Sequence, residues 1–238
     1  MNAFTPYRRS LQEMREDRPF TPAEERLIAE CRQGETVALG WEVPEGPSPE
    51  LEIRGELIRH LMLGGCDDAP VSPTGVKLAG AWMGGELKLE GCESPLDLFL
   101  FKCGFAKKPV FRDARIGALN LSGSHLPGLN AHRLRAEKNV FLRQDFRSRG
   151  TVDLGGAQIG GQLACANGRF DGGDGPALYG NSLTVGADVF LCDGFRATGE
   201  VCLHGAQIGG QLDCGKGRFD GGDGPALNGD SLTVGTDV

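Results

Sequence analysis

The chain has 238 residues, of which 38 are glycine and only 7% are aromatic. Glycine at this level without a Gly-X-Y period excludes collagen and indicates turns at short intervals. No run approaches the roughly 18 apolar residues of a membrane-spanning helix, and the first 20 residues lack the apolar segment of a secretory signal. We therefore expect a cytoplasmic protein without a transmembrane segment.

The net charge of −7 hides a change of sign along the chain. Residues 1–75 hold 8 Lys and Arg against 14 Asp and Glu, residues 76–149 hold 13 against 7, and residues 150–238 hold 4 against 11. Residues 76–238 therefore carry almost no net charge together, but residues 76–149 are basic and residues 150–238 are acidic.

The N-terminal part predicts an arm followed by two helices. We expect residues 1–20 to form a flexible arm and residues 21–75 a helical cap. Thr21 and Glu24 have the spacing of a capping box, which marks the start of the first helix. An apolar face recurs from Glu50 to Leu63 and predicts the second helix. Such helices cover the first turn of a repeat structure, which otherwise exposes its core.

From residue 76 onward the sequence repeats itself. Residues 151–189 and 200–238 align without gaps at an offset of 49, with 30 identical residues in 39. Within this long repeat, apolar or small residues come in pairs two apart, and the pairs recur about every five residues. Residues two apart on an extended chain point the same way, so each unit predicts a short strand and a corner. Examples are Val76/Leu78, Ala81/Met83, Leu87/Leu89, Ala114/Ile116, Leu119/Leu121, Ser124/Leu126, Val201/Leu203, Ala206/Ile208, Leu212/Cys214 and Gly217/Phe219.

The nine differences between the two copies test this assignment of inward and outward positions. None falls on a position assigned inward. Changes as large as Gly155 to His204 are tolerable in solvent and disruptive in a packed interior. The repeat therefore predicts which side chains form the core.

The unit Ala-x-apolar-x-x occurs at residues 81–85, 157–161 and 206–210. In these units the chain resembles the pentapeptide-repeat family, over about residues 76–238. The resemblance implies a right-handed, four-sided parallel β-helix, so the expected fold class is mainly β with an N-terminal α-helical cap. Bacterial proteins with a helical head before such repeats are sometimes labelled membrane-associated oxidoreductases, but no residue pattern here supports that chemistry.

The last turn has no covering element, because the chain stops at Asp237–Val238. An uncovered final turn exposes its core and its strand edges. We therefore expect the native chain to continue beyond Val238, or copies to stack end to end in a homo-oligomer.

The sequence offers no catalytic, cofactor or metal site that we accept. Residues 210–216 begin like a phosphate-binding loop but lack the Ser or Thr that follows the lysine, and strands are predicted around them. Cys192, Cys202 and His204 occupy outward positions without a fourth zinc ligand, so we expect them to be isolated surface residues. Two Asp/Gly-rich segments lack the ligand spacing of a calcium loop.

The basic segment is the strongest candidate for a binding surface. Stacked turns would gather several of its cations into one patch able to neutralise phosphates or an acidic partner. The candidate residues are Arg112, Arg115, Arg133, Arg135, Lys138, Arg143, Arg147 and Arg149.

We interpret the chain as a non-enzymatic β-solenoid that binds or scaffolds a protein partner through its charged outer faces. Three alternatives stay open. The chain could mimic DNA and occupy a DNA-binding enzyme such as gyrase, it could be an oxidoreductase of unknown chemistry, or it could bind nucleic acid through residues 112–149.

Overall fold

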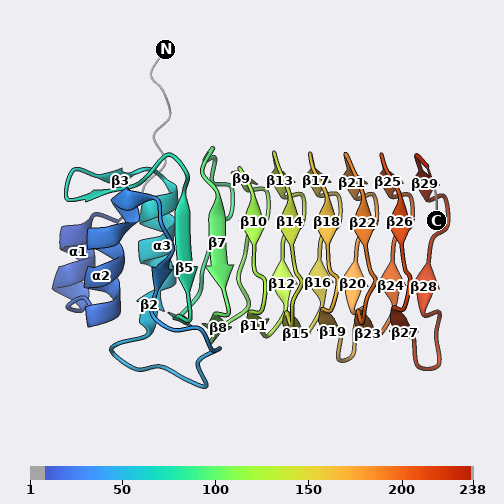
Figure 1. The fold of residues 1–238 in the computed structure, drawn as a ribbon, viewed down its shortest axis with the longest axis horizontal. Helices are drawn as coiled ribbons and strands as arrows, with labels where there is room; N and C mark the ends of the chain where they lie inside the picture. Colours follow the sequence, from blue (N-terminus) through green and yellow to red (C-terminus); the bar gives the residue numbers. More distant parts are fainter. Residues whose placement is uncertain (1–8, 237–238) are drawn as a thin grey trace, which may run out of the picture.

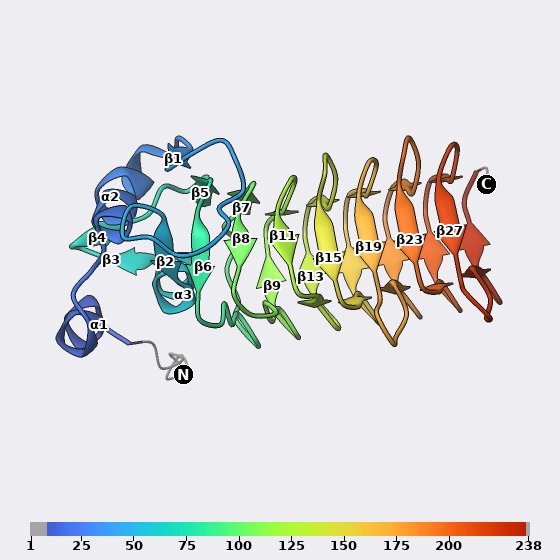
Figure 2. The ribbon, with the colours of Figure 1, turned by 90° about the horizontal axis from the view of Figure 1, so that it is seen from below.

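The computed structural model describes residues 9–236 and shows an elongated β-solenoid with helices at its N-terminal end (Figure 1). The solenoid has about seven turns. Its strands are short and stack in parallel along the long axis, as the view from below also shows (Figure 2). The expected fold class, mainly β with an N-terminal helical cap, is confirmed.

In each complete turn, the described chain passes through four parallel sheets in a fixed order. Sheet 1 contains β1 (Val37–Ala38), β5 (Val76–Ala79), β7 (Leu98–Phe101), β10 (Leu119–Asn120), β14 (Val140–Phe141), β18 (Leu163–Ala164), β22 (Val189–Phe190) and β26 (Leu212–Asp213). Sheet 2 contains β2 (Glu52–Arg54), β6 (Trp82–Gly84), β8 (Gly104–Phe105), β11 (His125–Leu126), β15 (Arg147–Arg149), β19 (Arg169–Asp171), β23 (Arg196–Thr198) and β27 (Arg218–Asp220). Sheet 3 contains β12 (Leu129–Asn130), β16 (Val152–Asp153), β20 (Leu178–Tyr179), β24 (Val201–Cys202) and β28 (Leu227–Asn228). Sheet 4 contains β9 (Arg115–Ile116), β13 (Arg135–Ala136), β17 (Gln158–Ile159), β21 (Thr184–Val185), β25 (Gln207–Ile208) and β29 (Thr233–Val234).

The 49-residue repeat corresponds to two turns. Leu163 pairs with Val189, and Val189 pairs with Leu212, so the same sheet position recurs on three consecutive turns. The inward pairs predicted from the sequence are buried from Val76 through Leu212, and those of the last turn are half-buried. The pairing register of these strands is therefore set by burial, because a slip of one residue would turn the apolar side chains outward.

A phenylalanine stack runs through the core beneath sheet 2. Successive ring centroids are 5.2, 5.1 and 5.4 Å apart along Phe146, Phe170, Phe195 and Phe219. Each strand of this part of sheet 2 has an outward arginine. The phenylalanine precedes the arginine in Phe146-Arg147 and Phe195-Arg196, and it follows the arginine in Arg169-Phe170 and Arg218-Phe219. Where the ring comes from the later residue, the earlier residue is glycine, because a Cβ at Gly168 would lie 2.8 Å from the Phe170 ring.

The cap differs from the sequence expectation in two places. Residues 1–20 were expected to be a flexible arm, but Ser10 and Glu13 form a capping box at the start of helix α1 (Leu11–Asp17). Met14 of this helix is buried, because α1 packs onto the rest of the cap. Residues 1–8 lie outside the described residues.

The predicted second helix is wrong in its first turn. Residues 52–54 form β2, because Glu52 pairs with Trp82 in sheet 2, and only then does helix α3 (Gly55–Met62) begin. The β-hairpin β3 (Gly65–Cys66) and β4 (Ala69–Pro70) follows α3. Tertiary pairing therefore overrides the helical period at the start of this segment.

Helix α2 (Pro22–Glu30) begins at the predicted Thr21/Glu24 capping box and continues into the 3₁₀ helix η1 (Cys31–Gln33). Glu24 is fully buried and accepts two hydrogen bonds from the Arg54 guanidinium, at 2.8 and 3.0 Å. Since Arg54 belongs to β2, this ion pair fixes the cap to the first strand of sheet 2. Among the described residues, no helix is long and apolar enough to cross a membrane.

Replacing Gly168 by Ala tests the alternation of the phenylalanine stack. We expect Gly168→Ala to lower the free energy of unfolding by about 1–3 kcal/mol, because the added Cβ overpacks the Phe170 ring. Gly46→Ala is the matched control, since nothing lies within 4 Å of a Cβ at that position. Urea unfolding followed by circular dichroism measures both variants. Equal stability of Gly168→Ala and the parent chain would contradict this packing.

Candidate anion-binding face

Sheet 2 aligns one column of outward-facing positions along the whole solenoid. In each strand, the residues on either side of one central residue face the core, so that central residue faces outward. Strand pairing then places the outward residues of successive turns directly above one another. The column runs Glu52, Trp82, Gly104, His125, Arg147, Arg169, Arg196 and Arg218.

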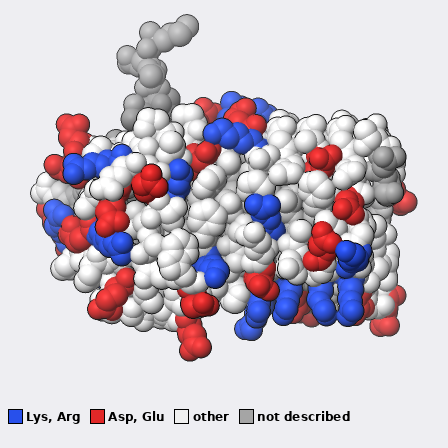
Figure 3. Space-filling view, in the orientation of Figure 1, with Lys and Arg blue, Asp and Glu red and all other residues white. Residues whose placement is uncertain are grey.

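The last four members form what we call the arginine ladder: Arg147, Arg169, Arg196 and Arg218. All four are exposed. Neighbouring strands in a sheet lie about 4.8 Å apart, so the ladder places four guanidinium groups over roughly 14 Å. Figure 3 shows the resulting row of Lys and Arg side chains along the edge where Figure 1 draws β15 to β27.

The ladder arginines form no direct ion pairs with neighbouring carboxylates. Among the ion pairs of the described residues, none includes a ladder arginine. The next outward column contains Asp171 and Asp220, but each of these carboxylates accepts a hydrogen bond from a backbone N–H of its own loop. The same column begins with Arg149, which pairs in register with Asp171 and adds a fifth cation.

Among the described residues, the outward columns of sheets 1, 3 and 4 are not uniform over the same turns. Sheet 1 has Phe141, Ala164, Phe190 and Asp213 in register. Sheet 3 has Asp153, Tyr179, Cys202 and Asn228. Sheet 4 has Arg135, Gln158, Thr184, Gln207 and Thr233. The outward residue of sheet 2 is therefore arginine in all four turns, whereas the outward residues of the other sheets differ from turn to turn. The arginine is also kept although the inward-facing phenylalanine next to it precedes it in two strands and follows it in the other two.

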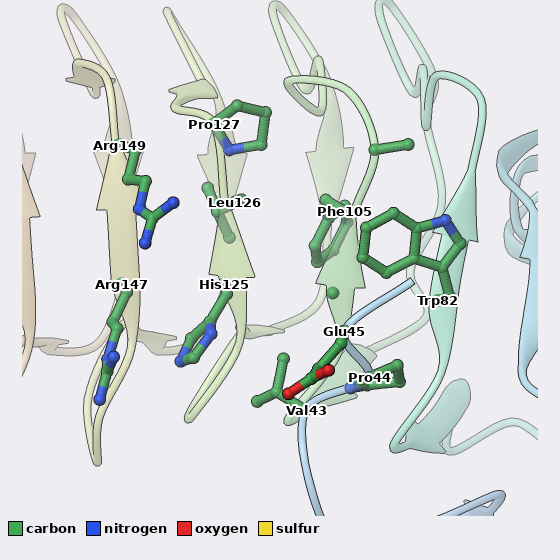
Figure 4. A pocket seen from close by; sticks show the side chains of 12 residues that line it. Val43, Pro44, Glu45, Trp82, Phe105, His125, Leu126, Pro127, Arg147 and Arg149 are labelled. Atoms are coloured by element: carbon green, nitrogen blue, oxygen red, sulfur yellow. The ribbon is translucent and has the colours of Figure 1, made fainter. Parts of the chain in front are cut away.

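A hollow of about 540 Å³ opens at the N-terminal end of the ladder (Figure 4). Its floor is sheet 2, one wall is the loop that contains Val43, Pro44 and Glu45, and its far end carries Arg147 and Arg149. A shallower depression of about 200 Å³ shares these two arginines and continues along the ladder to Arg196. The hollow and the ladder therefore form one surface.

Gly104 allows Trp82 and the loop of Pro44 to pack closely onto sheet 2 at the hollow. A Cβ at this position would lie 2.7 Å from the six-membered ring of Trp82 and 2.9 Å from the Pro44 carbonyl oxygen. Trp82 lies beside the buried Phe105 ring and stays partly exposed at the mouth of the hollow (Figure 4). The floor is therefore apolar and aromatic, whereas the far end is cationic.

His125 lies between the aromatic floor and the ladder. Partial burial, together with the Arg147 and Arg149 guanidinium groups, lowers the pKa of His125 below its ordinary value of about 6.5, against an opposing effect of Asp145. This shift favours the uncharged imidazole at neutral pH. An anion bound beside Arg147 would stabilise the protonated form and raise this pKa.

The structure distributes the sequence-predicted basic residues over several faces. Four of them form ion pairs with carboxylates of earlier turns: Arg112 with Glu90, Arg115 with Glu93, Arg133 with Asp113, and Lys138 with Asp97. Arg135 follows Arg115 in sheet 4, and Arg143 lies over the Phe141 ring at 4.5 Å. Only Arg147 and Arg149 belong to sheet 2.

The patch predicted from the sequence lacks three ladder arginines, Arg169, Arg196 and Arg218, because it was defined by the density of charge along the chain. The available signal was their position beside the inward phenylalanines, since Arg147 and Arg196, like Arg169 and Arg218, match across the 49-residue offset.

Two of the outward residues considered for zinc are not surface residues. Cys192 and Cys202 are 4% and 8% exposed. Burial raises the pKa of each thiol to about 11, with nearby carboxylates adding to the effect. His204 is exposed, as expected. Among the described residues, no group of three or more His, Cys, Asp or Glu side chains has an arrangement that could hold a metal ion.

No protein-family model matches the chain, and no curated protein or solved structure is significantly similar to it. The parallel solenoid is consistent with the repeats read from the sequence, but membership of the pentapeptide-repeat family is not established by a family match.

The pKa of His125 offers a direct test of the local electrostatics. We expect it to lie below 6.5 and to rise in the Arg147→Gln/Arg149→Gln variant, because removing two cations removes part of the cost of protonation. NMR titration of the imidazole resonances measures both values. The control is Arg112→Gln/Arg115→Gln, which removes the same charge from another face and leaves the pKa of His125 unchanged. A value above 6.5 in the parent chain would overturn the assignment.

Proposed function

We propose that the chain is a non-enzymatic binding module whose working surface is the arginine ladder and whose partner is an extended anionic chain. One observation carries this proposal: four consecutive turns present arginine at the same exposed position, and none of these side chains has an ion-pair partner among the described residues. A scaffold role suits a rod of this kind, because the ladder and its partner would run along the same axis.

The arrangement is unfavourable for the free protein. Like charges placed directly opposite one another on neighbouring strands repel, and a surface without functional demands has no reason to repeat them. Four other cations of the basic segment are paired, as Arg133 is with Asp113 at 2.6 and 2.7 Å, whereas the exposed Arg135 of sheet 4 is in no ion pair among the described residues. A bound polyanion removes the repulsion and releases counterions, so its affinity falls as salt increases.

The ladder also bears on the other candidate functions. A DNA mimic needs an extended acidic face, whereas the uniform charged column of sheet 2 is cationic. Inhibition of gyrase by the purified protein would support the mimic in spite of this, and an absence of inhibition or protection over a broad concentration range would count against it.

Binding of labelled polyanions tests the proposal. Polyphosphate, poly-glutamate and a single-stranded oligonucleotide are titrated with the parent chain and with Arg169→Gln/Arg196→Gln, and fluorescence anisotropy reports the affinity at several salt concentrations. We expect at least one probe to bind in a salt-dependent manner. We also expect the double variant to bind more weakly and to show a flatter salt dependence, because fewer counterions are released.

The control variant is Arg112→Gln/Arg115→Gln, which removes two charges from the segment opposite sheet 2. Its affinity is expected to match that of the parent chain, since both side chains are already paired with glutamates. Failure of every probe to bind, or an equal loss in the two double variants, would contradict a role for the ladder.

A further inference from the structure

We infer that the hollow at the N-terminal end of the ladder holds a nucleobase, so that the anionic partner is a single-stranded nucleic acid. This inference rests on the proposed function and names the partner class of the same surface. Three features of the hollow carry it: the partly exposed Trp82 ring, the Glu45 carboxylate on the loop that forms one wall, and the cations at the far end.

The size and lining of the hollow suit a flat aromatic group. The volume of about 540 Å³ falls within the range of small-ligand sites in proteins, and its floor consists of Trp82, the bare backbone of Gly104 and the apolar Phe105 and Leu126. Proteins that bind single strands combine a cationic track for the backbone with aromatic side chains against which bases stack. Sheet 2 places both on one column, because Trp82 and the ladder share the same outward register.

Glu45 distinguishes a base from an acidic side chain. A carboxylate on the wall repels Asp or Glu of an acidic peptide, but accepts hydrogen bonds from the amino group of a base. Arg147 and Arg149 lie at the far end of the hollow, where they can contact the phosphate attached to that base (Figure 4). The following phosphates then run along Arg169, Arg196 and Arg218.

A duplex does not satisfy this arrangement. Its bases are stacked and paired inside the double helix, so none is available to the hollow, although its phosphates can still contact the ladder. The inference therefore separates three probes that all present a row of phosphates: a single strand, a duplex, and a single strand without bases.

The chain contains two tryptophans, Trp41 and Trp82, which allows a specific reporter. Trp41 is 64% exposed and lies outside the hollow, so Trp41→Phe leaves Trp82 as the sole tryptophan. This variant is titrated with a single-stranded oligonucleotide of about ten nucleotides, a length within the usual site sizes of single-strand-binding modules. An abasic strand with the same number of phosphates, a duplex and poly-glutamate are titrated in parallel.

We expect only the base-bearing single strand to change Trp82 fluorescence. It should bind roughly 5- to 150-fold more tightly than the abasic strand, the range that corresponds to stacking of one base on an aromatic side chain. In the full chain, Trp82→Leu should lower affinity for the oligonucleotide by a similar factor and leave affinity for the abasic strand unchanged. Because the strand comparison uses the Trp41→Phe chain, which keeps Trp82, it does not depend on how the Trp82→Leu variant folds.

The outcomes separate the inference from the proposed function. Equal binding of the base-bearing and abasic strands, without a fluorescence change, would overturn the base site and leave the ladder intact. Tighter binding of poly-glutamate than of the oligonucleotide would overturn it in favour of an acidic protein partner. Loss of all binding would overturn both proposals.

Discussion

The spacing between stacked strands determines both how the core of this solenoid packs and how its surface charges are arranged. Each turn places its side chains directly over those of the previous turn, at the roughly 4.8 Å that backbone hydrogen bonding sets. Inside the solenoid, this spacing requires every residue to fit the residue above and below it. On the surface, the same spacing aligns charged side chains into rows. This alignment holds even where like charges in a row repel one another and destabilise the free protein.

The interior meets the requirement by alternation. Phe146 and Phe195 precede the outward arginine of their strands, whereas Phe170 and Phe219 follow it, and the rings still stack at 5.1–5.4 Å. Glycine at residue 168 makes room for the second arrangement. The exposed column of sheet 2 does not alternate, since arginine keeps its place in all four turns. This contrast between a core that varies and a row of exposed residues that does not is the physical basis for assigning a function to sheet 2.

The sequence allowed the inside and outside of the solenoid to be predicted, since pairs such as Val201/Leu203 repeat with the corner-forming period and are buried. It also located the start of α2 at Thr21. It did not locate β2, because the pairing of Glu52 with Trp82 joins segments 30 residues apart that share no local signal. Long-range pairing of this kind overrides local period.

The candidate face was only partly predictable for the same reason. Arg147 and Arg169 are 22 residues apart, whereas Arg169 and Arg196 are 27 apart, because a glycine-rich loop enlarges one turn. A count of charge along the sequence therefore grouped Arg147 with Arg133, which belongs to another face and is paired with Asp113. The hollow depends on a loop of the cap lying over Gly104, and nothing in the repeat pattern indicates that contact.

Side-chain NMR of the arginines tests the central claim most directly, because each Nε–Hε group reports on its own surroundings. On addition of a polyanion, the account predicts that the resonances of Arg147, Arg169, Arg196 and Arg218 shift together. It also predicts that those of the ion-paired Arg112 and Arg133 remain in place. Shifts spread over all faces, or confined to the paired arginines, would contradict a binding role for sheet 2.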